Sequence, residues 1–322
     1  MQFPFQLSDD KEFDVVGFGT NAVDYLITVP EYPAFNSKIE LDHYTEAAGG
    51  EIASTMAGLQ RLGMKTAYVG RFGGDRAGEI GLASLVDEGV DVSFTENILG
   101  ANTQIAFIMI DAASGERTII WQRDKLLAYE EPDAPVAAAT RCKVLHMTPH
   151  DTHACIRMAT AAKTNGAVVS VDIDNIFDDI EDLLPLVDIC IGSAEFTQKL
   201  LGTTDVRQGL CELNSRFGCA ITGVTMGKSG SLLLCDGQLI ETAAFNVPGG
   251  CVDTTGAGDA FRTGLLYGLI TGEPLEESGR MGNAVAALKC RGTGARSTLP
   301  NKIELLTLLK IYRLFVIRCN TI

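Results

Sequence analysis

Several features that would point to other classes of protein are missing from this 322-residue sequence. No apolar run approaches the ~20 residues that a membrane-spanning helix needs, because proline and charged residues interrupt the longest ones. Basic residues are scarce, since 26 Lys and Arg face 41 Asp and Glu and leave a formal net charge of −15. Because nucleic acids and anionic membranes are polyanions, we expect this chain to bind neither of them.

Regularly spaced cysteines are also missing. The nine cysteines are scattered, and none forms the C-x-x-C or Cys/His spacing of a zinc site. His146, His150 and His153 lie close together, but no fourth ligand stands at zinc spacing, so we expect polar loop residues rather than a metal site. The start of the chain, MQFPFQLSDDKEF, lacks the basic and apolar regions of a signal peptide. We therefore expect free thiols and a cytoplasmic location.

Short β-branched runs alternate with longer amphipathic stretches along most of the chain. Strands are expected at residues 15–18, 66–69, 144–147, 168–172, 189–191, 221–225 and 231–235, and helices at residues 52–62, 77–88, 153–165, 205–217, 260–270 and 276–290. This alternation predicts an α/β fold, in which a doubly wound, mostly parallel sheet is flanked by helices. Residues 311–322 mix arginine with apolar residues and predict a final amphipathic helix.

Two segments break this alternation. Residues 24–45 and 102–123 are rich in Ile, Thr, Tyr and Phe, alternate with period two and contain turn signals. They predict hairpin strands that project from the main sheet as a small β-strand lid. Both fall early in the chain, and no repeat or Pro/Ser-rich linker separates two parts of it. We therefore expect one domain, residues 1–322, with the lid segments inserted within it.

Two glycine-rich segments imitate nucleotide-binding motifs. Residues 17–22, Gly-Phe-Gly-Thr-Asn-Ala, match G-x-G-x-x-A, but a strand-like run follows where the dinucleotide motif requires a helix. Residues 223–229, Gly-Val-Thr-Met-Gly-Lys-Ser, have three residues between the glycines where a Walker A loop requires four. We expect neither a nicotinamide site nor a P-loop, and a titration with NAD would test the first expectation.

The segment Asp253-Thr-Thr-Gly-Ala-Gly-Asp259 carries the clearest chemical signal. Its small residues Gly256, Ala257 and Gly258 leave backbone N–H groups open to an anion, just before a stretch that predicts a helix from Ala260. The N-terminus of a helix favours phosphate, because its N–H groups are unpaired and its dipole is positive there. Asp259 falls at the expected N-cap, where it would either cap the helix, worth ~1 kcal/mol, or act as a general base. Spacing alone favours the cap.

Six motifs in order along the chain resemble the signatures of one family, the ribokinase-like (PfkB) carbohydrate kinases. They are Ala48-Gly49-Gly50 with the later Arg61-Leu62-Gly63, residues 70–78, Gly115-Glu116-Arg117, Thr225-Met-Gly227-Lys-Ser-Gly230, residues 253–261 and Asn283-Ala284. The resemblance spans nearly the whole chain, from the first expected strand to Pro300. It implies the ribokinase-like fold and a kinase that uses ATP and Mg²⁺, and it leaves open a monovalent cation such as K⁺.

The resemblance assigns roles on the phosphate side of the site. In this family the aspartate of G-A-G-D takes the proton from the attacking hydroxyl, and that role falls on Asp259. The N–H groups of Gly256, Ala257 and Gly258 would form an anion hole for the transferring phosphoryl group. For the nucleotide, the resemblance implies contacts from Thr225, Gly227, Gly230 and Asn283.

On the acceptor side, Asp24 matches the first-strand aspartate that holds sugar hydroxyls in these kinases. A carboxylate can accept two hydroxyl hydrogen bonds, although a solvated residue at a strand end is the alternative. Gly49 and Gly50 would let the backbone approach the sugar. Arg123 and Gln104 on the lid are weaker candidates, because a lid arginine can equally be a surface cation.

Three departures from the family pattern bear on the substrate and the metal. Glu51 and Ser54 stand where relatives often carry asparagines that contact the sugar. The N-x-x-E element used around Mg²⁺ is replaced by a segment in which Glu195 is the displaced carboxylate, as in ketohexokinase-like members. The D-P-N element becomes Asp172-Ile-Asp174.

The sequence therefore predicts an ATP-dependent sugar kinase whose acceptor is ribose-like or ketohexose-like. A nucleoside kinase of the same fold is the nearest alternative, and a sugar- or nucleotide-binding regulator without catalysis is another. Lid strands of this fold often pair between protomers, so a homodimer through the lid is expected by analogy. Otherwise the expected partners are the small-molecule acceptor and ATP.

Overall fold

The main sheet has eight strands. The structure is a computed structural model that describes residues 4–113 and 117–319. From one edge to the other, the strands are β14 (Gln238–Thr242), β13 (Ser231–Cys235), β12 (Ile221–Thr225), β11 (Ile189–Ser193), β10 (Val168–Ile173), β9 (Cys142–Met147), β1 (Phe13–Phe18) and β4 (Thr66–Val69). All neighbours from β4 to β12 pair in parallel, whereas β13 and β14 are antiparallel. The expected α/β fold with a mostly parallel sheet is confirmed.

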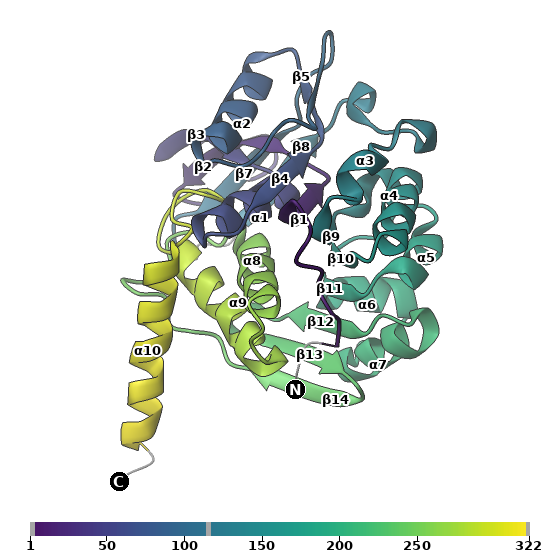
Figure 1. Cartoon of the computed structure of the whole chain (residues 1–322). Coiled ribbons are helices and arrows are strands. Elements are labelled where there is room, and N and C mark those ends of the chain that lie inside the picture. The colour runs from purple at the N-terminus through teal and green to yellow at the C-terminus, as the bar shows by residue number, and fades with distance from the viewer. Residues whose placement is uncertain (1–3, 114–116, 320–322) are drawn as a thin grey trace.

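Helices cover both faces of this sheet (Figure 1). One face carries α1 (Glu51–Arg61), α2 (Arg76–Asp87), α8 (Ala257–Ile270), α9 (Leu275–Lys289) and α10 (Lys302–Cys319). The other carries α3 (Val136–Ala139), α4 (Thr152–Thr164), α5 (Ile180–Leu183), α6 (Ala194–Leu201) and α7 (Val206–Phe217). Short 3₁₀ turns lie at Lys125–Leu127, Glu131–Asp133, Pro149–Asp151, Leu184–Leu186 and Gly227–Ser229.

The strands form because their apolar runs fill a core on each face. Successive side chains of a strand point to opposite sides, so Val15 lies in one core and Val16 in the other. All six residues of β10 are buried. Strands buried on both faces are apolar along their whole length, which is why the sequence marks them well.

Four further strands form a separate sheet, called the lid sheet below. In spatial order they are β3 (His43–Gly49), β2 (Ala22–Val29), β7 (Ile105–Asp111) and β8 (Arg117–Gln122). The central pair β2–β7 is parallel, and the outer pairs are antiparallel. The two segments expected to leave the main sheet thus contribute to one shared sheet. A small third sheet pairs β5 (Arg71–Gly73) with β6 (Glu96–Ile98).

The expected C-terminal helix is displaced. It begins at Lys302 rather than near residue 311, because Leu305, Leu308 and Leu309 pack against the core. In Figure 1, α10 extends away from the body at the lower left. Strand β14 and helix α6 were not predicted from the sequence.

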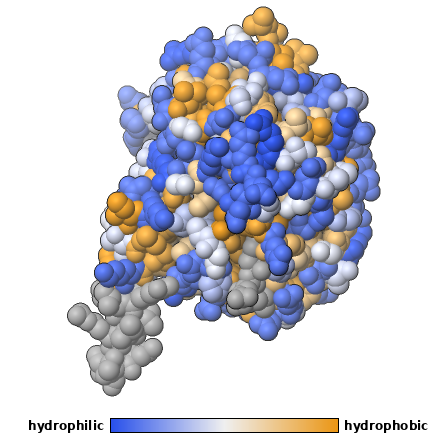
Figure 2. Space-filling view, in the orientation of Figure 1, coloured by the Kyte–Doolittle hydropathy of each residue, from blue (hydrophilic) through white to orange (hydrophobic). Residues whose placement is uncertain are grey.

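The surface is mixed in character. On the face shown in Figure 2, hydrophobic residues form separate patches among hydrophilic ones. Within the described ranges, no helix combines the length and apolar character that crossing a bilayer demands.

Candidate active site

A cavity of about 710 Å³ lies between the lid sheet and the main sheet. The lid sheet contributes Asp24 from β2, Ile108 from β7 and Trp121 from β8. The opposite wall comes from segments at the carboxyl ends of main-sheet strands and from the start of α8. In parallel α/β sheets, ligands bind at the carboxyl ends of the strands.

Seven of the expected site residues line this one cavity. They are Asp24, Gly50, Glu51, Glu195, Gly256, Gly258 and Asp259. These residues come from both ends of the sequence, and the fold brings them together. Asp172 and Asp174, which replace the family's D-P-N element, also line the cavity, and so does Gln104.

The glycine-rich segment forms a turn that begins α8. Gly256 is the N-cap residue and adopts φ = 74°, a left-handed conformation that glycine accommodates best. The helix starts at Ala257, so Asp259 lies in its first turn, and the expected N-cap position of Asp259 is wrong. Within the described chain no side chain caps this helix. The N–H of Ala257 donates to the Thr254 carbonyl oxygen at 3.1 Å, whereas the next N–H groups of the first turn remain available to an anion.

Asp259 has the environment of a group that can exchange a proton near neutral pH. Burial raises its pKa to about 6, while the positive charge of Arg262 opposes the rise and Asp174 adds to it. Its backbone is held by two hydroxyls, since Thr263 Oγ1 donates to its carbonyl oxygen at 2.9 Å and Thr55 Oγ1 at 3.4 Å. A base with a pKa near 6 is mostly ionised at pH 7.

Arg262 was missed by the sequence analysis. It stands one turn after Asp259 on α8, lines the cavity, and pairs with Asp172 at 2.5 Å. It also donates to the carbonyl oxygen of Ile191 at 3.1 Å. Its signal in the sequence was the i, i+3 spacing from Asp259, which places the two side chains on one helix face.

The cavity wall near Asp24 carries two carboxyl groups with altered pKa values. Asp24 is 5% exposed, and burial raises its pKa to about 7 although Arg296 opposes the rise. Glu51 accepts a hydrogen bond from Thr20 Oγ1 at 3.1 Å. Burial, followed by the charges of Asp259 and Asp174, raises the pKa of Glu51 to about 8.

Gly49 and Ser54 are not among the residues that line the cavity, so their contact with the acceptor stays a prediction. A side chain on Gly49 would collide with the carboxylate of Asp24, so this glycine makes room for Asp24 rather than for a sugar. Ser54 is 1% exposed and accepts a hydrogen bond from Arg296 Nε at 3.2 Å. Arg296 also donates to Ser84 Oγ at 2.7 Å and to the Gly49 carbonyl oxygen.

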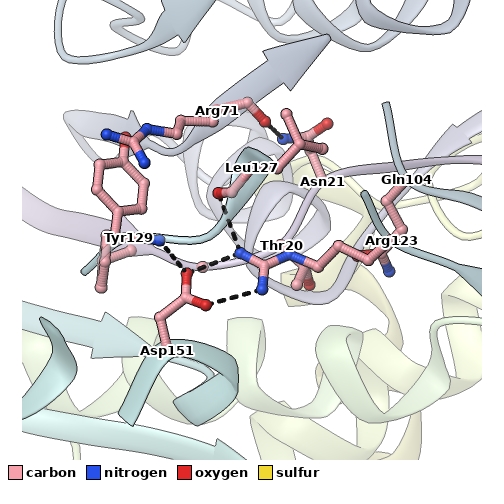
Figure 3. A pocket seen from close by; sticks show the side chains of 10 residues that line it. Thr20, Asn21, Arg71, Gln104, Arg123, Leu127, Tyr129 and Asp151 are labelled. Carbon is pink, nitrogen blue, oxygen red and sulfur yellow. Dashed lines mark hydrogen bonds and ion pairs between the residues drawn. The ribbon is translucent and has the colours of Figure 1, made fainter. Parts of the chain in front are cut away.

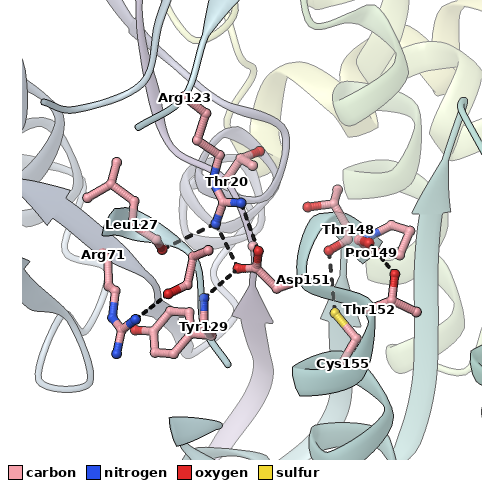
Figure 4. A network of polar contacts seen from close by, with 12 residues as sticks. Thr20, Arg71, Arg123, Leu127, Tyr129, Thr148, Pro149, Asp151, Thr152 and Cys155 are labelled. Atoms are coloured by element: carbon pink, nitrogen blue, oxygen red, sulfur yellow. Dashed lines mark hydrogen bonds and ion pairs between the residues drawn. The ribbon is translucent and has the colours of Figure 1, made fainter. Parts of the chain in front are cut away.

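Arg123 is likewise occupied within the protein. It forms a two-pronged ion pair with Asp151, at 2.8 and 2.7 Å, and donates to the Leu127 carbonyl oxygen at 3.2 Å. Figure 3 shows this group among the side chains that line a small pocket of about 10 Å³, about the size of one water molecule. Figure 4 shows that Asp151 also accepts from the backbone N–H of Tyr129, at 3.1 Å. Arg123 therefore links Asp151 to the segment that ends in Leu127.

The lid reaches the glycine-rich segment through Arg117. Arg117 Nη1 donates to Thr254 Oγ1 at 2.6 Å. Arg117 is the arginine of the G-E-R motif, and it lines the cavity. Gly115 and Glu116 of that motif lie outside the described residues.

The expected nucleotide residues lie beyond the lining of this cavity. Thr225 ends β12, and Gly227 and Gly230 form the turn into β13. Asn283 Nδ2 donates to Thr242 Oγ1 at 2.9 Å and to Ser231 Oγ at 3.2 Å. Its amide is thus used to hold the β13–β14 hairpin, which departs from the expected contact with adenine or ribose.

The two imitations of nucleotide-binding motifs have other structures. Residues 17–22 lead from β1 directly into β2 without a helix. Residues 223–225 end strand β12, and the residues after them form a turn into the antiparallel strand β13, where a Walker A loop would lead into a helix.

The histidines differ from the expected polar loop residues. His146 is buried on β9, where Nδ1 lies 3.0 Å from Ser170 Oγ and burial lowers its pKa to about 3. His150 lies 4.9 Å from the Phe177 ring, and burial lowers its pKa to about 4. Exposed His153 pairs with Asp179 at 2.9 Å. Among the described residues, no three His, Cys, Asp or Glu side chains are grouped closely enough to hold a metal ion.

Comparison with known proteins gives consistent matches along the chain. A family model described as pfkB family carbohydrate kinase matches residues 13–302. A fructokinase of Klebsiella pneumoniae is 31% identical over 81% of this chain and 91% of that protein. A nucleoside kinase of Methanothermobacter thermautotrophicus is 26% identical over 92% of this chain and 95% of that protein. The structure of Arabidopsis thaliana ribokinase complexed with ribose and ATP superimposes with a TM-score of 0.80 and 24% identity, covering 92% of this chain and 99% of that one.

Proposed function

The chain belongs to the pfkB carbohydrate kinase family, and from this premise we propose that it transfers the γ-phosphoryl group of ATP to a hydroxyl of a ribose-like or ketohexose-like monosaccharide. The observation that carries the proposal is the position of Asp259. It stands in the first turn of α8, directly after the Gly256 turn, in the same cavity as Asp24. A base, an anion-binding helix terminus and an acceptor-binding carboxylate thus share one space.

The proposed step needs few groups from the protein. Asp24 accepts hydrogen bonds from acceptor hydroxyls, and Asp259 takes the proton of the attacking hydroxyl. The acceptor oxygen forms its bond to the γ-phosphorus as the bond to the bridging oxygen breaks and ADP leaves. The N–H groups of Gly256 and Gly258 stabilise the charge on the phosphoryl oxygens during transfer, whereas the N–H of Ala257, expected to join them, already donates to the Thr254 carbonyl oxygen.

The cavity suits a magnesium ion carried by the nucleotide. Asp174 and Glu195 supply carboxylate oxygens, the ligands that Mg²⁺ prefers, and the Glu195 side chain is 80% exposed toward water. Mg²⁺ sites in kinases commonly use one or two carboxylates together with substrate phosphates. When bound, the ion would offset the repulsion between ATP and a protein of net charge −15.

The nucleotide is expected to lie along the carboxyl ends of β11 and β12. Thr225 pairs in register with Ser193, two residues before Glu195. Thr225, Gly227 and Gly230 therefore stand at the same sheet edge as the carboxylates proposed for Mg²⁺. Asn283 would act through the hairpin it holds rather than by touching the nucleotide.

The proposal predicts that Asp259→Asn abolishes turnover while substrates still bind. Removing a general base costs roughly 10²–10⁴-fold in kcat. The measurement is ADP release over a panel of pentoses, ketohexoses, aldohexoses and nucleosides, with K⁺ present or absent. Asp87→Asn, an exposed change at the end of α2, is the control that should keep full activity.

Two results would count against this proposal. Near-full activity in Asp259→Asn would remove the general base. Background turnover of every acceptor by the wild type, with ligands still bound, would favour a non-catalytic regulator.

A nucleoside acceptor is the second candidate, and the cavity lining favours testing it. Trp121, Phe177 and Ile119 line the cavity and offer flat or apolar surfaces to a base. Faster turnover of a nucleoside than of its free sugar would select this alternative.

A further inference from the structure

A buried lysine stands behind the glycine-rich turn. Lys289 is the last residue of α9 and is 0% exposed. Its Nζ donates to the carbonyl oxygen of Asp253 at 2.9 Å and lies 3.9 Å from Asp253 Oδ2. Burying an ammonium group without a partner is very costly, so the position of Lys289 depends on Asp253.

The carboxylate of Asp253 joins two loops. Oδ1 accepts from the N–H of Thr255 at 2.8 Å, and Oδ2 accepts from the N–H of Gly294 at 2.8 Å. Hydrogen bonds to an ionised carboxylate are stronger than neutral ones. Asp253 is 1% exposed, and its pKa is lowered because Lys289 and these N–H groups outweigh the opposing effect of burial.

Both loops reach the cavity, and they touch each other there. Thr255, Gly256 and Ala295 are among its lining residues. A Cβ on Gly256 would lie 2.8 Å from the Cβ of Ala295, closer than side-chain atoms normally come. A shift of either loop would therefore move the other and the N–H groups that begin α8.

We propose that Lys289 is a positioning residue for phosphoryl transfer: its ammonium group holds Asp253 in place, and Asp253 then fixes the 254–258 turn against Gly294 and Ala295. This inference rests on the proposed function for its effect on rate. The clamp itself, Lys289–Asp253–Thr255/Gly294, is a property of the fold. Lys289 touches neither the acceptor nor the nucleotide in this scheme.

The charge of Lys289 also acts on the proposed base. The charged groups that influence Asp259 come from several elements: Arg262 on α8, Asp172 on β10, Asp174 after β10, Lys289 on α9, Arg296 after α9, Glu51 on α1 and Asp24 on β2. Lys289 is among those that lower the pKa of Asp259. Removing its charge should raise this pKa, so that more of the base is protonated at a given pH.

The test compares Lys289→Met with Lys302→Met, a change at an exposed lysine of α10. We expect Lys289→Met to lower kcat about tenfold or more, because small misplacements at a reacting centre cost up to about 10²-fold. The KM of the acceptor should change little, and the acidic limb of the kcat profile should move to higher pH. Lys302→Met should match the wild type in all three.

A double variant keeps the test decisive if Lys289→Met folds poorly. Lys289→Met/Asp253→Asn removes both charges, so no unpaired ion remains buried. The single variant Asp253→Asn is measured as well. If the two residues act as one clamp, the fold-loss of kcat in the double variant is smaller than the product of the fold-losses in Lys289→Met and Asp253→Asn. Strictly multiplicative losses would overturn the clamp.

Amide hydrogen exchange separates this inference from the proposed function. The 254–258 amides should exchange faster in Lys289→Met than in the wild type and Lys302→Met. Unchanged exchange, together with wild-type kcat and an unmoved acidic limb, would overturn the inference. A wild type that phosphorylates none of the acceptors would count against the proposed function alone, since exchange still measures the clamp.

Discussion

Asp24, the residue proposed to bind the acceptor, shows how a buried carboxyl group lowers the stability of the folded protein. The carboxyl group is almost entirely buried, and the pKa that burial raises to about 7 lies far above its value of 3.8 in an exposed chain. Between these two values the folded protein binds a proton that the unfolded chain has released. Stability therefore falls as the pH rises from about 4 to about 7.

Asp24→Asn should stabilise the protein at pH 8 while impairing phosphorylation of the acceptor. The gain should be on the order of 2–4 kcal/mol, since one pKa unit corresponds to about 1.4 kcal/mol. It should vanish near pH 4, where Asp24 is protonated in both states. Urea unfolding at the two pH values measures this, with Asp87→Asn as the control. A variant no more stable than the wild type at pH 8 would refute the argument.

Individual site residues were predictable when they stood in a short motif. Asp259, Gly256 and Gly258 lie within one segment, and all three line the cavity. Ser54 and Arg296 are 242 residues apart in the chain, so no local pattern could show that they bond. Lys289 and Asn283 were hidden for the same reason, because their partners lie on other elements.

At the scale of elements, the start of α8 decides the geometry of the site. The sequence predicts this start at Ala260, because aspartate is a common N-cap residue. In the structure, the left-handed backbone of Gly256 turns the chain into the helix three residues earlier. Asp259 is thereby released from capping and stands in the first turn, where its side chain reaches the cavity.

Gly256→Ala should lower both stability and kcat. The new Cβ meets a disfavoured φ and the close approach of Ala295, which together should cost about 1–3 kcal/mol. Gly272→Ala is a matched control, because Gly272 has φ = 85° but no atoms within 4 Å of the added Cβ. Urea unfolding should show a loss of stability in both variants. ADP release should show a loss of kcat in Gly256→Ala alone. Equal kcat values would show that the turn tolerates displacement.

Strands and helices of the main sheet were the most predictable elements. The strands are buried on both faces and the helices on one, so the apolar residues of each element predict it from composition and spacing. The lid sheet was predicted as hairpins, yet its central pair β2–β7 is parallel and joins segments far apart in the sequence. Pairing of this kind depends on the position of each segment in the whole fold.

At the scale of the whole molecule, the lid sheet covers the cavity and carries the only tryptophan of the chain. Trp121 is 55% exposed, and its ring lies 6.2 Å from that of His150 on the opposite wall. The other face of the lid sheet exposes Tyr44 and Phe107. A homodimer through the lid stays a prediction.

Binding of an acceptor should change the fluorescence of Trp121. The ring would pass from a partly wet surface to a site filled by ligand, so its emission should shift to shorter wavelength. A titration with the acceptor that gives the highest turnover measures the shift, and Trp121→Phe should abolish the signal. Saturating acceptor without any spectral change would argue that the lid does not contact it.

The contact between Arg296 and Gly49 has a consequence for how the molecule is made. The two residues are separated by 247 positions, and ribosomes add ~5–20 residues per second. For roughly 10 to 50 s, the newly made segment that carries Asp24, Gly49 and Ser54 waits for the arginine that will bind it. The part of the cavity wall that leaves the ribosome first is therefore among the last to form all of its contacts.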